Sequence, residues 1–549
     1  MSIALLTVLL AGVSEAVGQS VVLFANRVKP ARFVLSLAIA ALLVAAGYCA
    51  VVLSIWATFA FPASHRLRLE PLAQAVGLSY APLFFAFLAA LPYAGGALLW
   101  GLRLWQLGAM IGGVAAVAHL SPWAATEHVA LGWLAMIVVQ HAFGKPIAKL
   151  SLRIASAAAG TSIVGETAAV RRFARQLAHA STPVAAADAA PGTHANGRGG
   201  PAFRWFIATF IMVAAIVVAL SPLRAAIASP HVGGIFLRVG LNVVWFAIVA
   251  IVVAAFLAPL ETLGWWAGWY GDGVRTAQHP PAAPGTPADG EPLRYIVYLD
   301  GIAQSSATYT PDIETFLDAL ERELPTGVRL IRGIMAYSVL NRPLDDDPMY
   351  AWFWKLVEAL RAGAKTAVLG MFINIRNVMI VAVSADKRYG PLYNLGIAQV
   401  VHDQLVQSRY RSHSGIPITL LGYSGGGQMC AETAPLLKRA LGAPVEVISL
   451  GGVMTGTCPF LQIDRFHHMY GAKDVIEPVG RVMFSSRWAI AVRSRWNRAR
   501  RRGKITITHL GPVGHQVPGG LLDPNHVLPD GRTALRQTLD TIDAILRGT

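Results

Sequence analysis

The stretch Pro417-Ile-Thr-Leu-Leu-Gly-Tyr-Ser-Gly-Gly-Gly-Gln428 decides how the C-terminal half of this chain folds. An apolar strand leads into Gly422-x-Ser424-x-Gly426, and a helix is expected to begin near Gly426. A serine on a sharp strand-to-helix turn needs small neighbours, because the chain approaches itself there and the serine adopts a strained conformation. The pattern predicts a nucleophile at Ser424. The alternative is a glycine-rich turn at a strand end that happens to contain a serine.

A serine hydroxyl is a poor nucleophile without a base, and two later strands end in loops with suitable partners. The run Phe466–Tyr470 is followed by a loop that ends in Asp474, and Ile505–Leu510 is followed by a loop that ends in His515. Sites in open α/β sheets form at the carboxyl ends of the strands. We therefore expect His515 to act as the base and Asp474 to orient it.

Other interpretations of these side chains stay open. In one alternative, Asp474 only caps the following helix and Glu477 is the acid of the triad. In another alternative, His515 is a histidine of a surface loop and has no role in catalysis. The remaining histidines near the site, His467, His468 and His509, lie within strands and are interpreted as structural.

An oxyanion hole needs two donors directed at the developing negative charge. We expect one to be the backbone N–H of Gly425, directly after the serine, and the other that of Ile302, in the loop after the first strand. Gly301 leaves room for the backbone there. The alternative is an ordinary Asp-Gly turn.

From Arg294 onward the chain alternates short apolar runs with helical periodicity, which predicts a mostly parallel sheet with helices on both faces. Expected strands are Tyr295–Leu299, Leu330–Tyr337, Pro417–Gly422, Val445–Leu450, Phe466–Tyr470 and Ile505–Leu510, and expected helices are Pro348–Ala362, Leu392–Ser408 and Gln428–Leu441. Lys365–Ser384 is either a lid or flap over the site or a pair of buried strands.

The three motifs that end in Ser424, Asp474 and His515, in that order, resemble those of the α/β-hydrolase superfamily. The resemblance covers Arg294–Thr549, a little under half of the chain. It implies a doubly wound sheet of eight strands in the full family form, and it implies no cofactor. Since six strands are clear in the sequence, we expect the first antiparallel pair to be missing.

The composition of the whole chain points to a membrane. Of 549 residues, 54% are hydrophobic and only 14% are charged, against about 25% charged in soluble proteins. A net charge of +16 in so hydrophobic a chain favours a cytoplasmic membrane surface over nucleic acid as its partner. Three scattered cysteines form neither a disulfide framework nor a metal-ligand cluster.

Residues 1–265 are expected to form an all-α transmembrane bundle of about seven spans, with the first helix retained. The candidate spans are Ile3–Ala25, Phe33–Phe59, Tyr80–Trp100, Leu104–Leu120, His128–Phe143, Phe206–Leu220 and Gly240–Leu260. Lys and Arg gather in the odd loops, including Arg103 in the third and a flexible loop near 150–202. The positive-inside rule then predicts an integral protein of the plasma (inner) membrane, with the C-terminal half in the cytoplasm after a linker over 266–293.

Two polar features suggest contacts with lipid or between helices. Arg481–Lys504 is basic with interleaved aromatic residues, so that Arg493–Arg502 is expected to bind anionic lipid headgroups or to be a solvated basic helix. Glu15 and Gln19 lie one turn apart in the first span, as a functional pair or a polar interhelical contact.

These features predict a membrane-anchored serine hydrolase that cleaves a lipid or another hydrophobic acyl ester. One alternative is a transporter or membrane sensor whose hydrolase-like domain only binds ligand. Another is a scaffold that binds anionic lipid.

Overall fold

The computed structural model describes residues 2–60, 67–161, 163, 235–269, 292–346, 351, 353–356 and 367–548. The chain divides into two compact units. Unit 1 comprises Met1–Arg172 and Leu263–Val274, and unit 2 comprises Phe173–Thr262 and Arg275–Thr549. Helix α9 (Ile235–Trp266) contributes residues to both units. The expected linker over 266–293 lies outside the described residues, except for 266–269 and 292–293.

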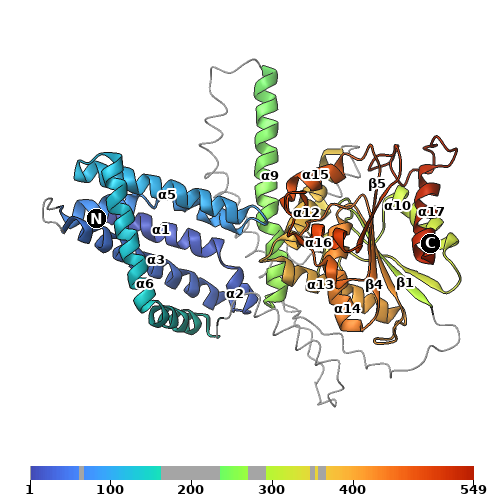
Figure 1. Ribbon diagram of the computed structural model, residues 1–549, viewed down its shortest axis with the longest axis horizontal. Helices are drawn as coiled ribbons and strands as arrows, with labels where there is room; N and C mark the ends of the chain where they lie inside the picture. Colours follow the sequence, from blue (N-terminus) through green and yellow to red (C-terminus); the bar gives the residue numbers. More distant parts are fainter. Residues whose placement is uncertain are drawn as a thin grey trace, which may run out of the picture. The chain divides into compact units, whose positions relative to one another are not determined.

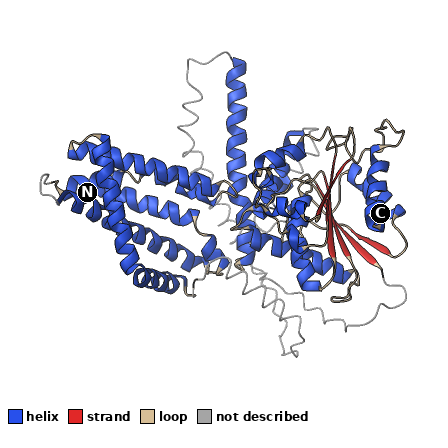
Figure 2. Cartoon of the chain, viewed as in Figure 1, coloured by secondary structure: helices blue, strands red, loops and turns tan. Residues whose placement is uncertain are grey.

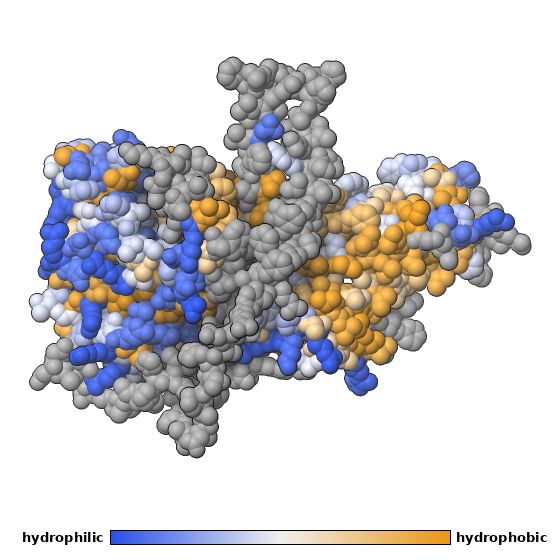
Figure 3. Space-filling model, turned by 180° about the vertical axis from the view of Figure 1, so that it is seen from behind, coloured by the Kyte–Doolittle hydropathy of each residue, from blue (hydrophilic) through white to orange (hydrophobic). Residues whose placement is uncertain are grey.

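Unit 1 is helical throughout its described elements (Figures 1 and 2). Its elements are α1 (Ser2–Gly18), α2 (Val21–Ala25), α3 (Pro30–Ala60), α4 (Leu69–Leu78), the 3-10 helix η1 (Ala81–Ala90), α5 (Gly95–Ala118) and α6 (Pro122–Ala159). A core that includes Val8, Ile55 and Leu72 holds them together. Hydrophobic residues cover much of the outer surface of this unit, on the right in Figure 3. An apolar exterior of this extent fits a hydrocarbon environment better than water.

Three helical segments among the described residues are long and apolar enough to cross a membrane: Pro30–Phe59, Leu69–Ala90 and Gly95–Ala118. The first matches the expected span Phe33–Phe59. The expected continuous span Tyr80–Trp100 is wrong, because the helix stops at Ala90 and a new one starts at Gly95. Between them lie Pro92, which cannot donate a backbone hydrogen bond, and Tyr93, which has a φ of 64°.

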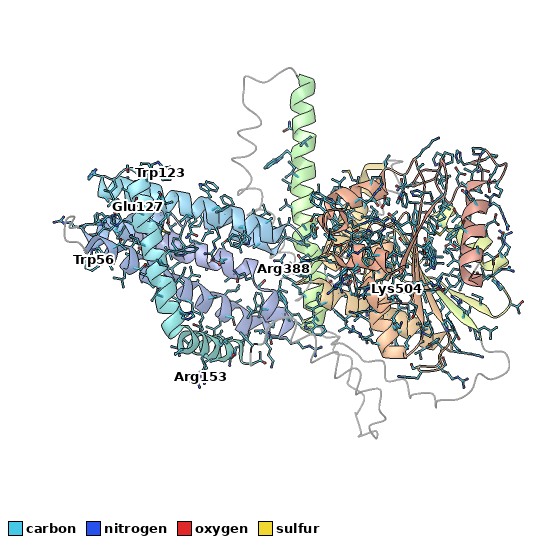
Figure 4. The ribbon with its side chains drawn as sticks, viewed as in Figure 1. Trp56, Trp123, Glu127, Arg153, Arg388 and Lys504 are labelled. Atoms are coloured by element: carbon cyan, nitrogen blue, oxygen red, sulfur yellow. The ribbon has the colours of Figure 1, made fainter. Side chains whose placement is uncertain are left out.

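The expected span Leu104–Leu120 lies in the third segment as far as Ala118, and the other candidate spans are distributed differently. Ile3–Ala25 is divided between α1 and α2, and His128–Phe143 and Gly240–Leu260 lie within α6 and α9. None of these is among the three segments above. Phe206–Leu220 lies outside the described residues. Helix α6 continues to Ala159, so the beginning of the expected loop near 150–202 is helical; Trp123 and Arg153 mark opposite ends of this helix (Figure 4).

Arg103 is not in a loop, as the sequence led us to expect, but inside α5. Its guanidinium forms an ion pair with Glu15 of α1, whose carboxylate also accepts a hydrogen bond from Gln19. An ion pair lowers the cost of charges in an apolar helix. Glu15 and Gln19 therefore belong to a polar contact between α1 and α5. Because Arg103 is not a loop residue, it no longer supports the orientation predicted by the positive-inside rule.

Unit 2 contains a six-stranded, wholly parallel sheet in the order β2-β1-β3-β4-β5-β6. The strands are β1 (Arg294–Leu299), β2 (Val328–Ile331), β3 (Ile418–Tyr423), β4 (Val445–Leu450), β5 (Phe466–Tyr470) and β6 (Ile505–His509). The chain goes outward from β1 to β2, then returns to β3 and proceeds in the other direction. Loops after β1 and β3 therefore diverge, and this switch point is where ligands bind in open α/β sheets.

Helices cover both faces of the sheet (Figure 1). On one face, α10 (Pro311–Glu323) and α17 (Ala534–Arg547) share a core with inward side chains such as Tyr298, Leu421 and Met469. The other face is covered by α14 (Gly426–Leu441), against which α12 (Ala367–Ala385) and α13 (Gly390–Gln407) pack. The expected doubly wound arrangement is thus present in its coarse form, a parallel sheet between helices.

Two predictions within unit 2 need correction. The expected strand Leu330–Tyr337 is only four residues long and ends at Ile331. Lys365–Ser384 is not a strand pair, because α12 extends from Ala367 to Ala385. Short apolar runs do not distinguish a strand from a buried helix. The expected helix Pro348–Ala362 lies mostly outside the described residues.

Candidate functional site

Ser424 lies on a tight turn between β3 and α14, with a φ of 50°. This left-handed conformation is unusual for a residue with a side chain and marks stored backbone strain. The glycines around it are required sterically. A Cβ on Gly422 would lie 2.7 Å from the carbonyl of Gly426, and one on Gly426 would lie 2.2 Å from the carbonyl oxygen of Leu299. The turn therefore tolerates only glycine at both positions.

The structure brings Ser424, His515 and Asp474 into one chain of hydrogen bonds. Ser424 Oγ lies 2.9 Å from Nε2 of His515, and Nδ1 of the same ring lies 2.8 Å from Asp474 Oδ2. All three residues are buried. The carboxylate only accepts, so Nδ1–H donates to it and Nε2 is left to accept the serine proton. This is the arrangement that activates a hydroxyl.

The second oxygen of Asp474 caps helix α15 (Ile476–Met483). Oδ1 accepts hydrogen bonds from the backbone N–H groups of Ile476 at 2.8 Å and Glu477 at 3.0 Å. The capping alternative from the sequence is thus present together with the contact to His515, not in place of it. Fixing one oxygen on the helix holds the other toward the imidazole.

Glu477, the alternative acid, has other partners. Its carboxylate, fully buried, binds His468 Nε2 at 3.2 Å and a terminal nitrogen of Arg487 at 2.7 Å. Burial favours the protonated form of Glu477, but the hydrogen bond from His468 and the charge of Arg487 outweigh it and lower its pKa. Burial also lowers the pKa of His468. As expected, His468 is structural, and its cluster anchors the first turn of α15.

The ring of His515 is held from two further sides. The Tyr423 hydroxyl donates to the backbone carbonyl of His515 at 2.8 Å, and the two rings stack with centroids 5.3 Å apart. Gly451, at φ 55° after β4, lies so close that a Cβ there would be 2.9 Å from both Asp474 Oδ2 and His515 Nδ1. Neither residue was singled out from the sequence, although a glycine directly after a buried strand was a usable signal.

The loop after β1 lies beside the serine. A Cβ on Gly301 would be 3.3 Å from the Cβ of Ser424, and one on Gly425 would be 2.9 Å from a methyl carbon of Ile302. The structure thus brings the two expected donor residues together. Within the described part of the chain, the N–H groups of Gly425 and Ile302 donate no hydrogen bond.

Asn377 of α12 holds the loop that contains Ile302. Its Nδ2 donates to the carbonyl oxygens of Ile302 and Gln304, each at 2.8 Å, and its side chain is fully buried. A buried amide that satisfies two loop carbonyls fixes the course of that loop. Sequence reasoning missed Asn377; the signal was a polar group in the middle of an otherwise apolar segment.

Arg376, the neighbour of Asn377, connects this loop support to α9. Its guanidinium donates to Asn377 Oδ1 at 2.9 Å and to the carbonyl of Tyr337 at 3.1 Å, and it forms a buried ion pair with Glu261. The Tyr337 hydroxyl in turn donates to the carbonyl of Asp300, where the loop begins. A polar network inside unit 2 therefore extends from α9 to the loop beside Ser424.

Asp300 follows β1 and is buried. Burial raises its pKa from 3.8 to about 6, although hydrogen bonds from the Gly301 N–H and the Tyr298 hydroxyl act in the opposite direction. The carboxyl therefore changes its charge near neutral pH, at the root of the loop that carries Ile302.

No protein-family model, curated protein or solved structure matches this chain. No group of three or more His, Cys, Asp or Glu side chains suited to a metal occurs among the described residues. Chemically, the arrangement offers a serine hydroxyl in contact with a base. Beside it lie Gly425 and Ile302, whose backbone N–H groups make no hydrogen bond within the described part of the chain.

Proposed function

We propose that unit 2 is a serine hydrolase of the α/β-hydrolase type that cleaves an ester through an acyl-enzyme intermediate. The observation that supports this most is the 2.9 Å contact between Ser424 Oγ and His515 Nε2, made by a serine held at positive φ. The order Ser, acid, His along the chain and the positions after β3, β5 and β6 agree with that family. The wholly parallel six-stranded sheet agrees with a family form that lacks its first antiparallel pair.

In the proposed reaction, Ser424 Oγ attacks the ester carbonyl carbon while its proton passes to His515 Nε2. Asp474 Oδ2 stabilises the imidazolium that forms. The C–O bond to the alcohol then breaks, and the alcohol leaves with the proton from His515. Water, deprotonated by His515, next attacks the acyl-enzyme, which releases the acid and restores the serine. A catalytic base contributes most when it is held in position before the substrate binds. The hydrogen bonds from Tyr423 to the His515 carbonyl and from His515 to Asp474 hold the imidazole in this way.

The negative oxygen of each tetrahedral intermediate would be bound by the N–H groups of Gly425 and Ile302. Removal of one such donor costs about 10²- to 10³-fold in kcat in enzymes of this type. This assignment is the reason to regard Asn377 as a positioning residue, because it holds the carbonyl of Ile302 itself.

A lipid or another hydrophobic acyl ester is the proposed substrate. Support comes from the three segments of the same chain that are long and apolar enough to cross a membrane. We further propose that unit 2 lies in the cytoplasm. Arg27 and Lys29, just before α3, and Arg32, in its first turn, support this orientation through the positive-inside rule.

A fluorophosphonate probe tests the nucleophile directly. The detergent-purified full chain should react with it, and Ser424→Ala should not. Ser449→Ala is a matched control, because Ser449 is also buried at a strand end but contacts His468 instead. Equal labelling of the Ser424→Ala and parent proteins would reject the proposal. Turnover of p-nitrophenyl esters of graded chain length would then identify the preferred acyl group.

A further inference from the structure

A continuous stretch of unit 2 exposes apolar side chains directly after Asp474. They belong to α15 and to the segment that follows the 3-10 helix η4 (Ser485–Arg487): Val475, Ile476, Val479, Val482, Met483, Trp488, Ile490 and Val492. Val482 is 70% exposed and Ile490 is 82% exposed. The opposite face of α15 is buried through Glu477 and Gly480, so the apolar face is the one turned to the outside.

The same stretch is strongly cationic. Its exposed charged residues are Lys473, Arg481, Arg493, Arg495, Arg498, Arg500, Arg501 and Arg502. The only acids between 473 and 502 are Asp474 and Glu477, and both are buried. Asp474 is paired with His515, and Glu477 is paired with Arg487 and with Arg481 of the same stretch. The exposed surface of this stretch therefore combines apolar and positive groups without a negative one.

Hydrogen bonds join these parts into one surface. The indole of Trp488 donates to the carbonyl of Arg481 at 2.9 Å. From α16 (Arg495–Arg501), Asn497 Nδ2 donates to the carbonyls of Trp488 and Ala491, and Arg501 donates to that of Val492 at 2.8 Å. The exposed segment is thus fixed to both helices and presents its side chains in a defined arrangement.

The aromatic residues expected to serve lipid contact only partly do so. Phe484 and Trp496 are buried; Trp496 packs edge-to-face against Phe460, and the guanidinium of Arg487 lies over its ring. Of the three aromatic residues in Arg481–Lys504, only Trp488 is exposed. The basic helix α16 therefore supplies charge, whereas α15 and residues 488–492 supply the apolar contact.

We propose that residues 473–502 form a docking surface for an anionic lipid bilayer. Arginines attract the headgroup charge, and the exposed valines, isoleucines and Trp488 enter the boundary between headgroups and acyl chains. A nucleic acid would use the arginines but would gain nothing from exposed Val482 and Ile490. The docking does not depend on the proposed hydrolase activity. If both hold, docking brings the sheet edge with Asp474 to the membrane, because Val475 follows that residue directly.

The test uses the full chain in nanodiscs, either of phosphatidylcholine alone or of phosphatidylcholine with phosphatidylglycerol. An NBD fluorophore is attached to Ile490→Cys in a Cys49→Ser background, since Cys430 and Cys458 are buried. Val527→Cys is the matched control, an exposed apolar residue of unit 2 outside the segment. An unchanged thermal unfolding midpoint shows that each variant is folded.

In anionic discs we expect NBD emission at position 490 to shift to shorter wavelength and its reduction by dithionite to slow severalfold. High salt, or Arg498→Gln with Arg500→Gln and Arg502→Gln, should reverse both changes. Position 527 should respond in neither disc. The proposal is overturned if position 490 behaves alike in neutral and anionic discs, if position 527 responds equally, or if an RNA oligonucleotide added to neutral discs protects position 490 as well as anionic lipid does.

Discussion

Asp474 Oδ2 lies 2.8 Å from Nδ1 of His515, while the other oxygen of the same carboxylate caps the first turn of α15. One side chain therefore orients the proposed base and stabilises a helix terminus. These two roles involve different atoms, so substitutions can separate them.

Asp474→Asn should abolish activity and preserve the fold. The amide oxygen still accepts from the N–H groups of α15, but its NH₂ group faces Nδ1 and forces the imidazole into the other tautomer, which cannot accept the serine proton. We expect kcat to fall about 10⁴-fold with little change in the unfolding midpoint. Asp474→Ala should lose the same activity and also about 1 kcal/mol of stability, because the helix loses its cap. An active Asp474→Asn protein would contradict the proposed role.

Asn377→Ala should slow the chemistry with little effect on substrate binding. Without the amide, the loop that carries Ile302 loses two hydrogen bonds, and its N–H is no longer held in place. We expect kcat and the rate of fluorophosphonate labelling to fall by about 10- to 100-fold, less than for loss of a whole donor, with KM nearly constant.

A control for Asn377 is Asn394→Ala. Asn394 is also buried, and it makes two hydrogen bonds to Ser384 and none to the loop. If both variants lower kcat to the same extent, general destabilisation explains the effect and positioning does not.

The buried pair of Glu261 and Arg376 should be costly to break from one side only. Glu261→Gln leaves the Arg376 charge without its counter-ion in a buried site, for which we expect a loss of about 3–5 kcal/mol of unfolding free energy. Arg376→Met should cost a similar amount. The double variant should lose clearly less than the sum of both, which a double-mutant cycle in detergent measures. The exposed pair of Arg532 and Asp530 is the control, where Asp530→Asn should leave the unfolding free energy nearly unchanged. Strict additivity at Glu261 and Arg376 would refute the coupling.

Asp300 should make the folded state less stable as pH rises. Its pKa is about 6 in the folded protein and 3.8 in the absence of burial, so the folded state binds the proton more tightly. The protonated carboxyl is tolerated below about pH 4, and the cost of ionisation grows as pH rises toward 6. Above about pH 6 the loss of stability reaches its full value of about 3 kcal/mol, which corresponds to a shift of roughly two pKa units. Asp300→Asn should remove this part of the pH dependence. Parallel stability curves for the parent and Asp300→Asn proteins between pH 4 and 7 would disprove it.

Local chemistry made the elbow around Ser424 predictable. A strand, a serine and glycines at fixed spacing describe a turn whose steric demands arise within a few residues, and those demands are visible as the close approach of Gly422 to Gly426. The strands before Asp474 and His515 were equally readable, because a parallel sheet places successive strand ends at one edge.

Sequence patterns gave wrong predictions where a helix and a strand, or a loop and a helix, produce the same pattern of residues. The apolar halves of Lys365–Ser384 fit a strand pair as well as a helix, and α12 is the outcome. Arg103 was interpreted as a loop charge, because the sequence does not show Glu15 of a different helix, 88 positions away, as its partner.

By itself, the sequence determined an apolar helical N-terminal part, an alternating C-terminal part with strands at nearly the right bounds, and the three residues Ser424, Asp474 and His515 that meet in space. Only the tertiary structure decided which groups support them: Asn377 reaches Ile302 across 75 positions, and Arg376 reaches Glu261 across 115. The physical reason is range. Turn sterics and periodicity act between near neighbours, whereas the partner of a buried amide or charge depends on how whole helices pack against the sheet.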